Sequence, residues 1–251
     1  MRDFFKGLRM FGQGLGILLR TPRLLLIGAL PAVITTVLLV SGLVTLFFSL
    51  DELALLITPF ADTWAETARD VLRFAASVLL FAAGLMLSSF LFSALTLAIG
   101  GPFYENIAEK VEDDLGGVPD AVDLGFFTLL WMGIADAVRL LGRSLLFTVP
   151  LFFAGFIPLV GQFVVPVLLA LVTSWFMALE LVGVPFYRRG MALKERRELL
   201  RKRRMLGMGL GLPTTLLCMI PVAGIIVMPV AFVGGVLVAR ETLGLNSRVP
   251  A

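Results

Sequence analysis

The chain has 251 residues, of which 59% are hydrophobic and 16% are charged, and its formal net charge at pH 7 is +3. A soluble globular domain is about 45–50% apolar and about 25% charged, so this composition excludes an ordinary soluble protein and predicts an integral membrane protein. The sequence contains no histidine and one cysteine, Cys218, which excludes a histidine proton shuttle and a disulfide framework. Because no catalytic motif is present either, we predict no enzyme activity, no metal site and no cofactor.

Residues 1–20 predict an amphipathic helix, because apolar residues recur at helical spacing on one face and basic or polar residues on another. The apolar face consists of Phe4, Leu8, Phe11, Leu15 and Leu18, and the polar face of Arg2, Lys6, Arg9, Gln13 and Arg20. Such a helix can lie in the membrane surface, or it can pack on the rest of the protein as an ordinary amphipathic helix. Both interpretations stay open.

Two apolar segments are long enough to cross a bilayer. Residues 24–50 follow Thr21, which can cap a helix, and Pro22, which suits the first helical turn. Residues 71–100 form the second segment. Because a hydrocarbon core of about 30 Å requires about 20 helical residues, we predict two transmembrane helices, joined by an acidic and turn-like connection.

The segment 101–143 is polar, acidic and interrupted by glycine and proline. We predict that it lies outside the hydrocarbon as a polar loop, followed by an amphipathic helix over 126–143. In that helix Asp136 lies one turn before Arg139. An exposed pair at this spacing contributes only a few tenths of a kcal/mol, so we predict a solvated surface pair.

A proline-glycine pattern occurs twice in the C-terminal half, as "FIPLVGQFVVPV" at 156–167 and "MIPVAGIIVMPV" at 219–230. The uncharged runs before the two patterns would reach only about 21–23 Å as helices, which is short of the hydrocarbon thickness. We therefore predict two partly inserted, re-entrant helical hairpins, at 144–184 and 206–239, whose arms are separated by breaks at membrane depth. The predicted tips contain Pro158, Gly161, Pro221 and Gly224. Two fully spanning, kinked hairpins are the alternative.

The charge distribution predicts the topology. The connection at 188–204 has nine Lys or Arg residues against two Glu, and the N-terminal segment is also basic. Since basic flanks stay cytoplasmic, both termini and this connection are predicted on the cytoplasmic side, in contact with lipid. We predict no nucleic-acid binding, because the basic run lacks interleaved aromatic residues. The expected fold is thus one all-α membrane domain over 1–251.

Several motifs resemble the CysZ/EI24 family of sulfate-permease-like membrane proteins. The stretch "GPFYENIAEKVE" at 101–112 resembles its Pro-Phe-Asn and Ala-Glu-x-Val-Glu signature. The "YRRG…ERR" stretch at 187–197, the "LGMG" before the second hairpin and the "IPVAGIIVMPV" pattern resemble its C-terminal half. The matching signature positions are Pro102, Phe103, Ala108, Glu109, Val111 and Glu112, and the N-terminal similarity lies in the spacing of Gly7, Gly14, Pro22 and Pro31.

The resemblance implies two long transmembrane helices, two partly inserted hairpins and assembly as a homo-oligomer in a bacterial plasma membrane. It also implies uptake of sulfate or a related small oxyanion that feeds cysteine synthesis. The alternative that it implies is a non-transporting scaffold or assembly factor. Two positions depart from the sulfate-permease members. Leu25 stands where they have the arginine of a Pro-Gly-Leu-Arg segment, so that Arg23 is the nearest cation, and Tyr104 replaces the asparagine of the signature.

The start of the first transmembrane helix is our predicted anion site. Free N–H groups and the positive end of the helix dipole attract oxyanions, and Arg20, Thr21 and Arg23 would add charge and a hydroxyl group. The alternative is that these arginines only fix the orientation of the helix in the membrane.

Three carboxylates are further candidates. Glu180 could bind a proton during symport, or it could anchor the end of the first hairpin, with Arg188 or Arg189 as its ion-pair partner. Glu109 and Glu112 lie one turn apart, and we expect both to form structural ion pairs at the cytoplasmic end of the second transmembrane helix.

Overall fold

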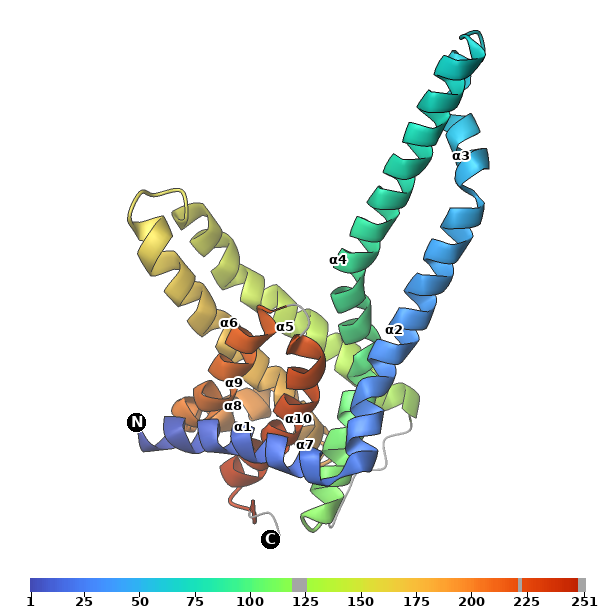
Figure 1. Ribbon diagram of the computed structural model, residues 1–251. Coiled ribbons are helices and arrows are strands. Elements are labelled where there is room, and N and C mark those ends of the chain that lie inside the picture. Colours follow the sequence, from blue (N-terminus) through green and yellow to red (C-terminus); the bar gives the residue numbers. More distant parts are fainter. Residues whose placement is uncertain (119–125, 221–222, 248–251) are drawn as a thin grey trace. The chain divides into compact units, whose positions relative to one another are not determined.

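The computed structural model describes residues 1–118, 126–220 and 223–247 (Figure 1). These residues form ten α-helices with a short 3₁₀ helix and a π-helical turn between them. Among the described residues, four segments are long and apolar enough to cross a membrane: Pro22–Phe48, Glu66–Asp114, Val160–Leu181 and Ala223–Thr242. The all-helical class is therefore confirmed, and the two predicted transmembrane segments lie in helices of sufficient length. The other two segments are the longer arms of the predicted hairpins, and they too are long enough to cross.

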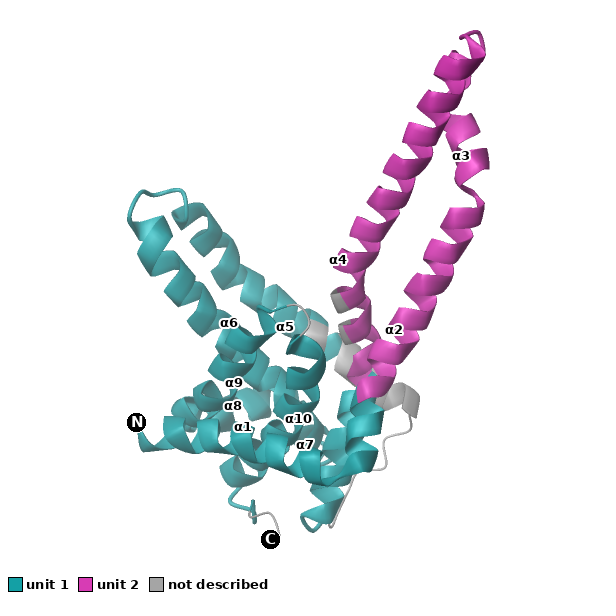
Figure 2. Cartoon of the chain, in the orientation of Figure 1, with its two compact units in different colours: residues 1–28, 102–251 teal, residues 29–101 magenta. Residues whose placement is uncertain are grey.

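The chain divides into two compact units (Figure 2). Residues 29–101 form the two-helix unit, and residues 1–28 together with 102–251 form the core unit. Helices α2 (Pro22–Phe48) and α4 (Glu66–Asp114) contribute to both.

In the two-helix unit, α2 and α4 are joined through α3 (Leu50–Ile57) and a 3₁₀ helix at Pro59–Ala61. Gly84 of α4 accommodates the side chain of Leu46, and the rings of Phe47 and Phe81 meet edge to face at 6.0 Å. Much of the remaining surface of the unit is apolar and exposed, including Phe74 and Phe90. An apolar surface of this extent is matched to hydrocarbon rather than to water.

The centre of the core unit is formed by α1 (Arg2–Arg20), α6 (Val165–Leu181), α9 (Arg204–Cys218) and α10 (Ala223–Thr242). Their buried side chains include Leu18, Leu181, Leu206, Leu210, Val233 and Leu237. Glycine permits a close crossing of α1 and α9, because a Cβ atom on Gly7 would meet the backbone carbonyl of Leu206 and lie 3.0 Å from the Cα of Gly209. Small residues at such crossings let backbones approach and pack without voids.

Helix α1 packs on the rest of the protein, but through a face that we did not predict. Its buried residues are Gly7, Met10, Gly14 and Leu18, so that Leu18 is the one member of the predicted apolar stripe that is buried. Leu8 and Leu15 of that stripe are each 40% exposed. The helix therefore has three faces: a glycine-rich face against α9 and α10, an exposed apolar ridge, and a basic polar face. The ridge remains suited to contact with lipid.

The polar segment 101–143 differs from the prediction. We expected it to start as a loop, but α4 continues through Gly101 and Pro102 to Asp114. Helix α5 (Phe126–Ala154) likewise joins the predicted amphipathic helix and the first arm of the predicted hairpin into one element. A polar sequence indicates that a segment lies outside the hydrocarbon, but a helix can continue into such a segment without ending at the membrane boundary. Pro102 removes one backbone hydrogen bond, which a long helix tolerates.

The first predicted hairpin tip connects α5 and α6, which lie side by side (Figure 1). The turn includes Leu159 with a positive φ of 67° and the π-helical turn Val160–Val164. Gly161 is required here, because a Cβ atom would overlap the carbonyl oxygen of Gly155. In the second repeat Pro221 lies outside the described residues, and Gly224 is buried in the first turn of α10.

Candidate functional site

The predicted anion site lies where α1 ends and α2 begins. The side chains of Arg20 and Arg23 are exposed, and among the described residues neither forms an ion pair or a hydrogen bond. The carbonyl of Thr21 accepts hydrogen bonds from the N–H groups of Leu24 at 2.9 Å and Leu25 at 3.3 Å. Because Pro22 has no N–H group, the backbone of this first turn offers a ligand at most the N–H of Arg23. The guanidinium groups, rather than the helix terminus, are the main donors here.

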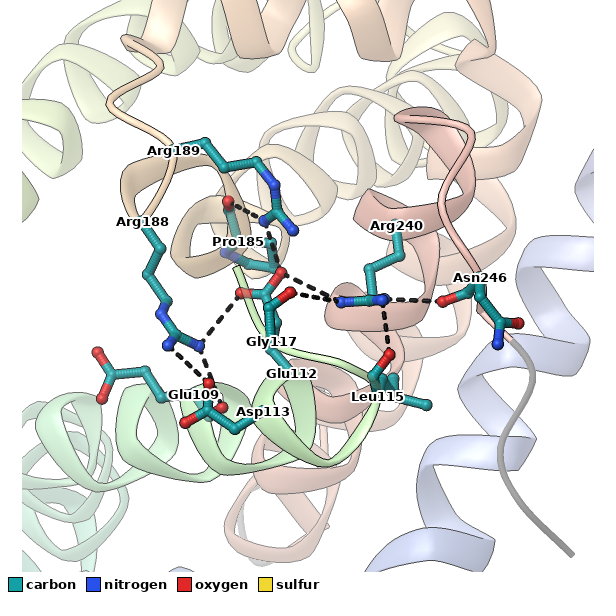
Figure 3. Close-up of polar contacts among 10 residues, drawn as sticks. All are labelled: Glu109, Glu112, Asp113, Leu115, Gly117, Pro185, Arg188, Arg189, Arg240 and Asn246. Atoms are coloured by element: carbon teal, nitrogen blue, oxygen red, sulfur yellow. Dashed lines mark hydrogen bonds and ion pairs between the residues drawn. The ribbon is translucent and has the colours of Figure 1, made fainter. Parts of the chain in front are cut away.

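A second polar cluster surrounds Glu112, whose side chain is fully buried near the end of α4 (Figure 3). Its Oε1 lies 2.5 Å from Nη1 of Arg189 and 3.8 Å from Nη1 of Arg240, and its Oε2 lies 3.6 Å from Nη1 of Arg188. Arg188 also binds Asp113 at 2.6 Å. The two successive arginines directly follow the short helix α7 (Gly183–Tyr187), and Arg240 comes from the last turn of α10.

Arg240 connects the end of α10 to the turn that follows α4. Its Nη2 donates to the carbonyl of Leu115 at 2.7 Å, its Nη1 to that of Gly117 at 3.3 Å, and its Nε to that of Asn246 at 2.8 Å (Figure 3). Positive φ angles of 109° at Gly116 and 65° at Gly117 form this turn. Glycine adopts them without steric cost, and the turn then directs its carbonyls toward the guanidinium.

The other signature residues have less polar roles. The backbone carbonyl of Glu109 accepts a hydrogen bond from Arg188 at 3.3 Å, and its carboxylate forms no ion pair among the described residues. Tyr104, which replaces the family's asparagine, is buried with its ring 5.8 Å from that of Phe232. Pro102 and Phe103 lie in the same turn of α4.

Glu180 does not pair with Arg188 or Arg189, and that expectation was wrong. Both arginines bind acidic residues of α4, and the cation that interacts electrostatically with Glu180 is Arg196 of α8 (Leu193–Lys202). The reason is that α6 ends at Leu181, so the spacing of a continuous helix is lost before the two arginines are reached.

Arg196 is the centre of a third polar cluster. Its side chain is 1% exposed, its Nη2 lies 3.5 Å from Oδ2 of Asp136, and its Cζ lies 4.9 Å from the ring centroid of Tyr187. Gly183 makes room for the guanidinium, since a Cβ atom there would lie 2.6 Å from Nη1. Burial raises the pKa of the Tyr187 hydroxyl above its ordinary value.

The prediction for Asp136 is corrected by this cluster. Asp136 binds Arg139 at 3.1 Å as expected, but it is buried at 5% exposure and contacts Arg196 instead of lying in solvent. The i,i+3 spacing to Arg139 indicated the local partner, and it contained no information on a residue 60 positions later in the chain.

The cluster around Glu112 and the predicted anion site differ in what they can bind. The arginines around Glu112 already donate to carboxylates and carbonyls, so this cluster is suited to holding the ends of α4, α7 and α10 together. Arg20 and Arg23 keep their donors available, and a guanidinium binds tetrahedral oxyanions through paired N–H groups. Among the described residues, no group of three or more Cys, Asp or Glu side chains could hold a metal ion.

A comparison with known protein families matches this chain over residues 10–229 to the model described as "Sulfate transporter CysZ/Etoposide-induced protein 2.4". The matched range runs from α1 into α10. It includes Arg20, Arg23, Glu112 and Glu180, whereas Arg240 lies beyond it.

Proposed function

The chain belongs to the CysZ/EI24 family, and on that premise we propose that it facilitates uptake of sulfate or a related small oxyanion across a bacterial plasma membrane. The observation that carries the proposal is the extent of the family match, which covers residues 10–229 under a description that includes a sulfate transporter. The exposed guanidinium groups of Arg20 and Arg23, which have no ion-pair partner in the described part of the chain, support it, because they supply oxyanion donors at the start of a membrane-length helix.

In the proposed mechanism, Arg20, Thr21 and Arg23 bind the anion at the cytoplasmic mouth of the path. Arg23 takes the part of the family's arginine, which lies two positions later, where this chain has Leu25. The carboxylate of Glu180 is a candidate for proton binding if uptake is coupled to protons, with Arg196 as its nearby counter-charge.

We expect purified protein in proteoliposomes to take up radiolabelled sulfate faster than empty vesicles. The double substitution Arg20→Gln and Arg23→Gln should lower the initial rate at low sulfate by tenfold or more, because the loss of even one charge-assisted hydrogen bond, worth about 1.5–3 kcal/mol, exceeds the roughly 1.4 kcal/mol that corresponds to tenfold. The matched control is Arg201→Gln with Lys202→Gln, which removes two exposed cations of α8. Uptake by the proteoliposomes that is no faster than by empty vesicles contradicts sulfate transport. An equal loss of uptake rate in both double variants contradicts the anion site at Arg20 and Arg23.

We further propose that both hairpins enter the membrane from the cytoplasmic side and return to that side. Because two transmembrane helices precede them, both termini then lie on the cytoplasmic side, and the 51–70 connection lies outside. Support comes from the tip of the first hairpin, where Phe156, Leu159 and Phe163 are 73%, 71% and 68% exposed. Gln162 is the one polar residue between Val149 and Val172. A turn that emerged into water on the far side would expose these apolar side chains, whereas a tip within the hydrocarbon buries them in lipid.

This layout predicts a clear difference in cysteine accessibility. In a Cys218→Ser background, Leu159→Cys should resist a membrane-impermeant maleimide applied from outside to intact cells. Thr63→Cys lies at an exposed position of the outer connection and should react readily. Labelling of both cysteines at similar rates would show that the first hairpin spans the membrane.

A scaffold or assembly role without a solute path is the second candidate. The observation that favours it is that Leu25 replaces an arginine, while Arg188, Arg189 and Arg240 are occupied by the protein's own carboxylates and carbonyls. Sulfate uptake no faster than in empty vesicles would favour this role. In either case we propose a homo-oligomer, since neighbouring copies can cover the exposed apolar faces of a short hairpin.

A further inference from the structure

A polar cavity of about 610 Å³ lies in the core unit between α1 and the segment that follows α10. On one side it is lined by the polar face of α1, and on the other by the end of α10 and residues 244–247. The polar lining residues are Lys6, Arg9, Gln13, Glu241, Asn246 and Ser247. Neither the predicted anion site nor the arginine cluster around Glu112 includes any of these side chains.

The one acid in the lining is already neutralised. The carboxylate of Glu241 binds Lys6 at 2.5 Å and Arg203 at 2.9 Å, and it accepts a hydrogen bond from Ser247 at 3.2 Å. Arg203 is shared with Asp3, at 3.1 Å. These contacts neutralise the one carboxylate of the cavity lining.

Arg9 supplies the charge that remains. Lys6 and Arg203 balance Asp3 and Glu241, so Arg9 adds a positive charge that no acid of the cavity lining neutralises. Arg9 is exposed, and within the described part of the chain its guanidinium has no ion pair or hydrogen bond. It lies one helical turn from Lys6 and from Gln13 on the same face of α1, so that an entering anion would meet all three side chains.

We propose that this cavity binds a phosphate group carried on a larger organic body. A guanidinium with a neighbouring ammonium and an amide donor suits a phosphate monoester. The volume lies within the range of about 300–1,000 Å³ that is typical of organic ligands, and a bare sulfate would leave most of it to water. The phosphate can belong to a soluble metabolite or to the headgroup of an anionic lipid.

The location gives the ligand a structural effect that is separate from transport. It would bridge α1 and the end of α10, which are distant in sequence and meet at this cavity. Arg9 and Arg20 are 11 positions apart on one helix, which corresponds to about 16 Å along the helix axis. Phosphate binding here and sulfate binding at Arg20 and Arg23 can therefore be tested independently.

The test uses the full chain in phosphatidylcholine nanodiscs, with inorganic phosphate, glycerol 3-phosphate and adenosine 5′-monophosphate as soluble probes. A parallel arm uses nanodiscs that contain phosphatidic acid. We expect at least one phosphate ester to bind in calorimetry and raise the Tm, and Arg9→Gln to weaken that binding at least tenfold. The matched control is Arg2→Gln, which removes an exposed arginine from the same helix outside the cavity and should change binding less than twofold.

The outcomes separate the possible sources and also test the proposal itself. Loss of phosphate binding in Arg9→Gln but not in Arg2→Gln supports the proposal. If the loss is seen with the soluble esters, the phosphate comes from a metabolite, and if it is seen with phosphatidic acid, it comes from a lipid. Equal weakening by Arg2→Gln would mean diffuse attraction to a basic helix, and binding of none of the four phosphates would leave no such site. Both results overturn the proposal.

Discussion

Replacing Glu112 by glutamine should be the most destabilising conservative substitution in the core unit. The side chain of Glu112 is 0% exposed and lies among the guanidinium groups of Arg188, Arg189 and Arg240. Removing one partner of a buried ion pair leaves uncompensated charge and typically costs about 3–5 kcal/mol. We therefore expect Glu112→Gln to lower the Tm of the detergent-solubilised protein strongly and to increase proteolysis near residue 188.

The matched control is Asp113→Asn in the adjacent position. Asp113 binds Arg188 at 2.6 Å, but its side chain is 56% exposed. An exposed pair contributes about 0–1 kcal/mol, so this variant should unfold close to the wild-type temperature. If the two variants lower the Tm equally, burial of the Glu112 side chain does not explain the contribution of this ion-pair cluster to stability.

The same substitution at two glycines of α1 should have opposite effects on stability. Gly7→Ala places a methyl group against the carbonyl of Leu206 and the backbone of Gly209, so α1 must move away from α9. Overpacking of this kind costs about 1–3 kcal/mol, and the neighbouring backbone cannot rotate aside as a flexible side chain would. We expect a lower Tm and faster proteolytic removal of the first helix.

Gly12→Ala is the counterpart. Apart from the adjacent residues and the backbone of its own helix, no atom lies within 4 Å of the position that its Cβ would take, and the residue is exposed. Alanine is favoured over glycine in an exposed helix by about 0.5–1 kcal/mol, so the Tm should rise. Stabilisation by both variants would mean that α1 does not depend on close contact with α9.

Much of the fold followed from local patterns. Length and hydropathy predicted the apolar segments that became α2 and α4, and the 3.6-residue periodicity of residues 1–20 predicted α1. The faces of α1 were assigned incorrectly, because a glycine face contributes nothing to a hydrophobic periodicity even where it is the closest packing surface. The continuation of α4 to Asp114 was missed because polarity and helix termination are independent properties.

The polar clusters could not be predicted from spacing. Glu112 meets arginines that lie more than 70 positions away, and Arg196 meets Asp136 across 60 positions. Sequence reasoning indicated Glu112 and the stretch that contains Arg196 through the family resemblance, but it gave neither residue its partner, and Arg240 carried no local signal beyond a general basic character. An arginine in a basic connection can serve as a topology signal and still be buried, as Arg196 is, and only tertiary packing decides between these roles.

The contact of α1 with α9 and α10 also sets an order of events during synthesis. The first helix leaves the ribosome early, yet its partners begin at residues 204 and 223. At translation rates of about 5–20 residues per second, this corresponds to a delay of roughly ten to forty seconds. During that interval, the ridge formed by Phe5, Leu8, Leu15 and Leu19 can hold the nascent segment at the bilayer surface, close to where its glycine face will later dock.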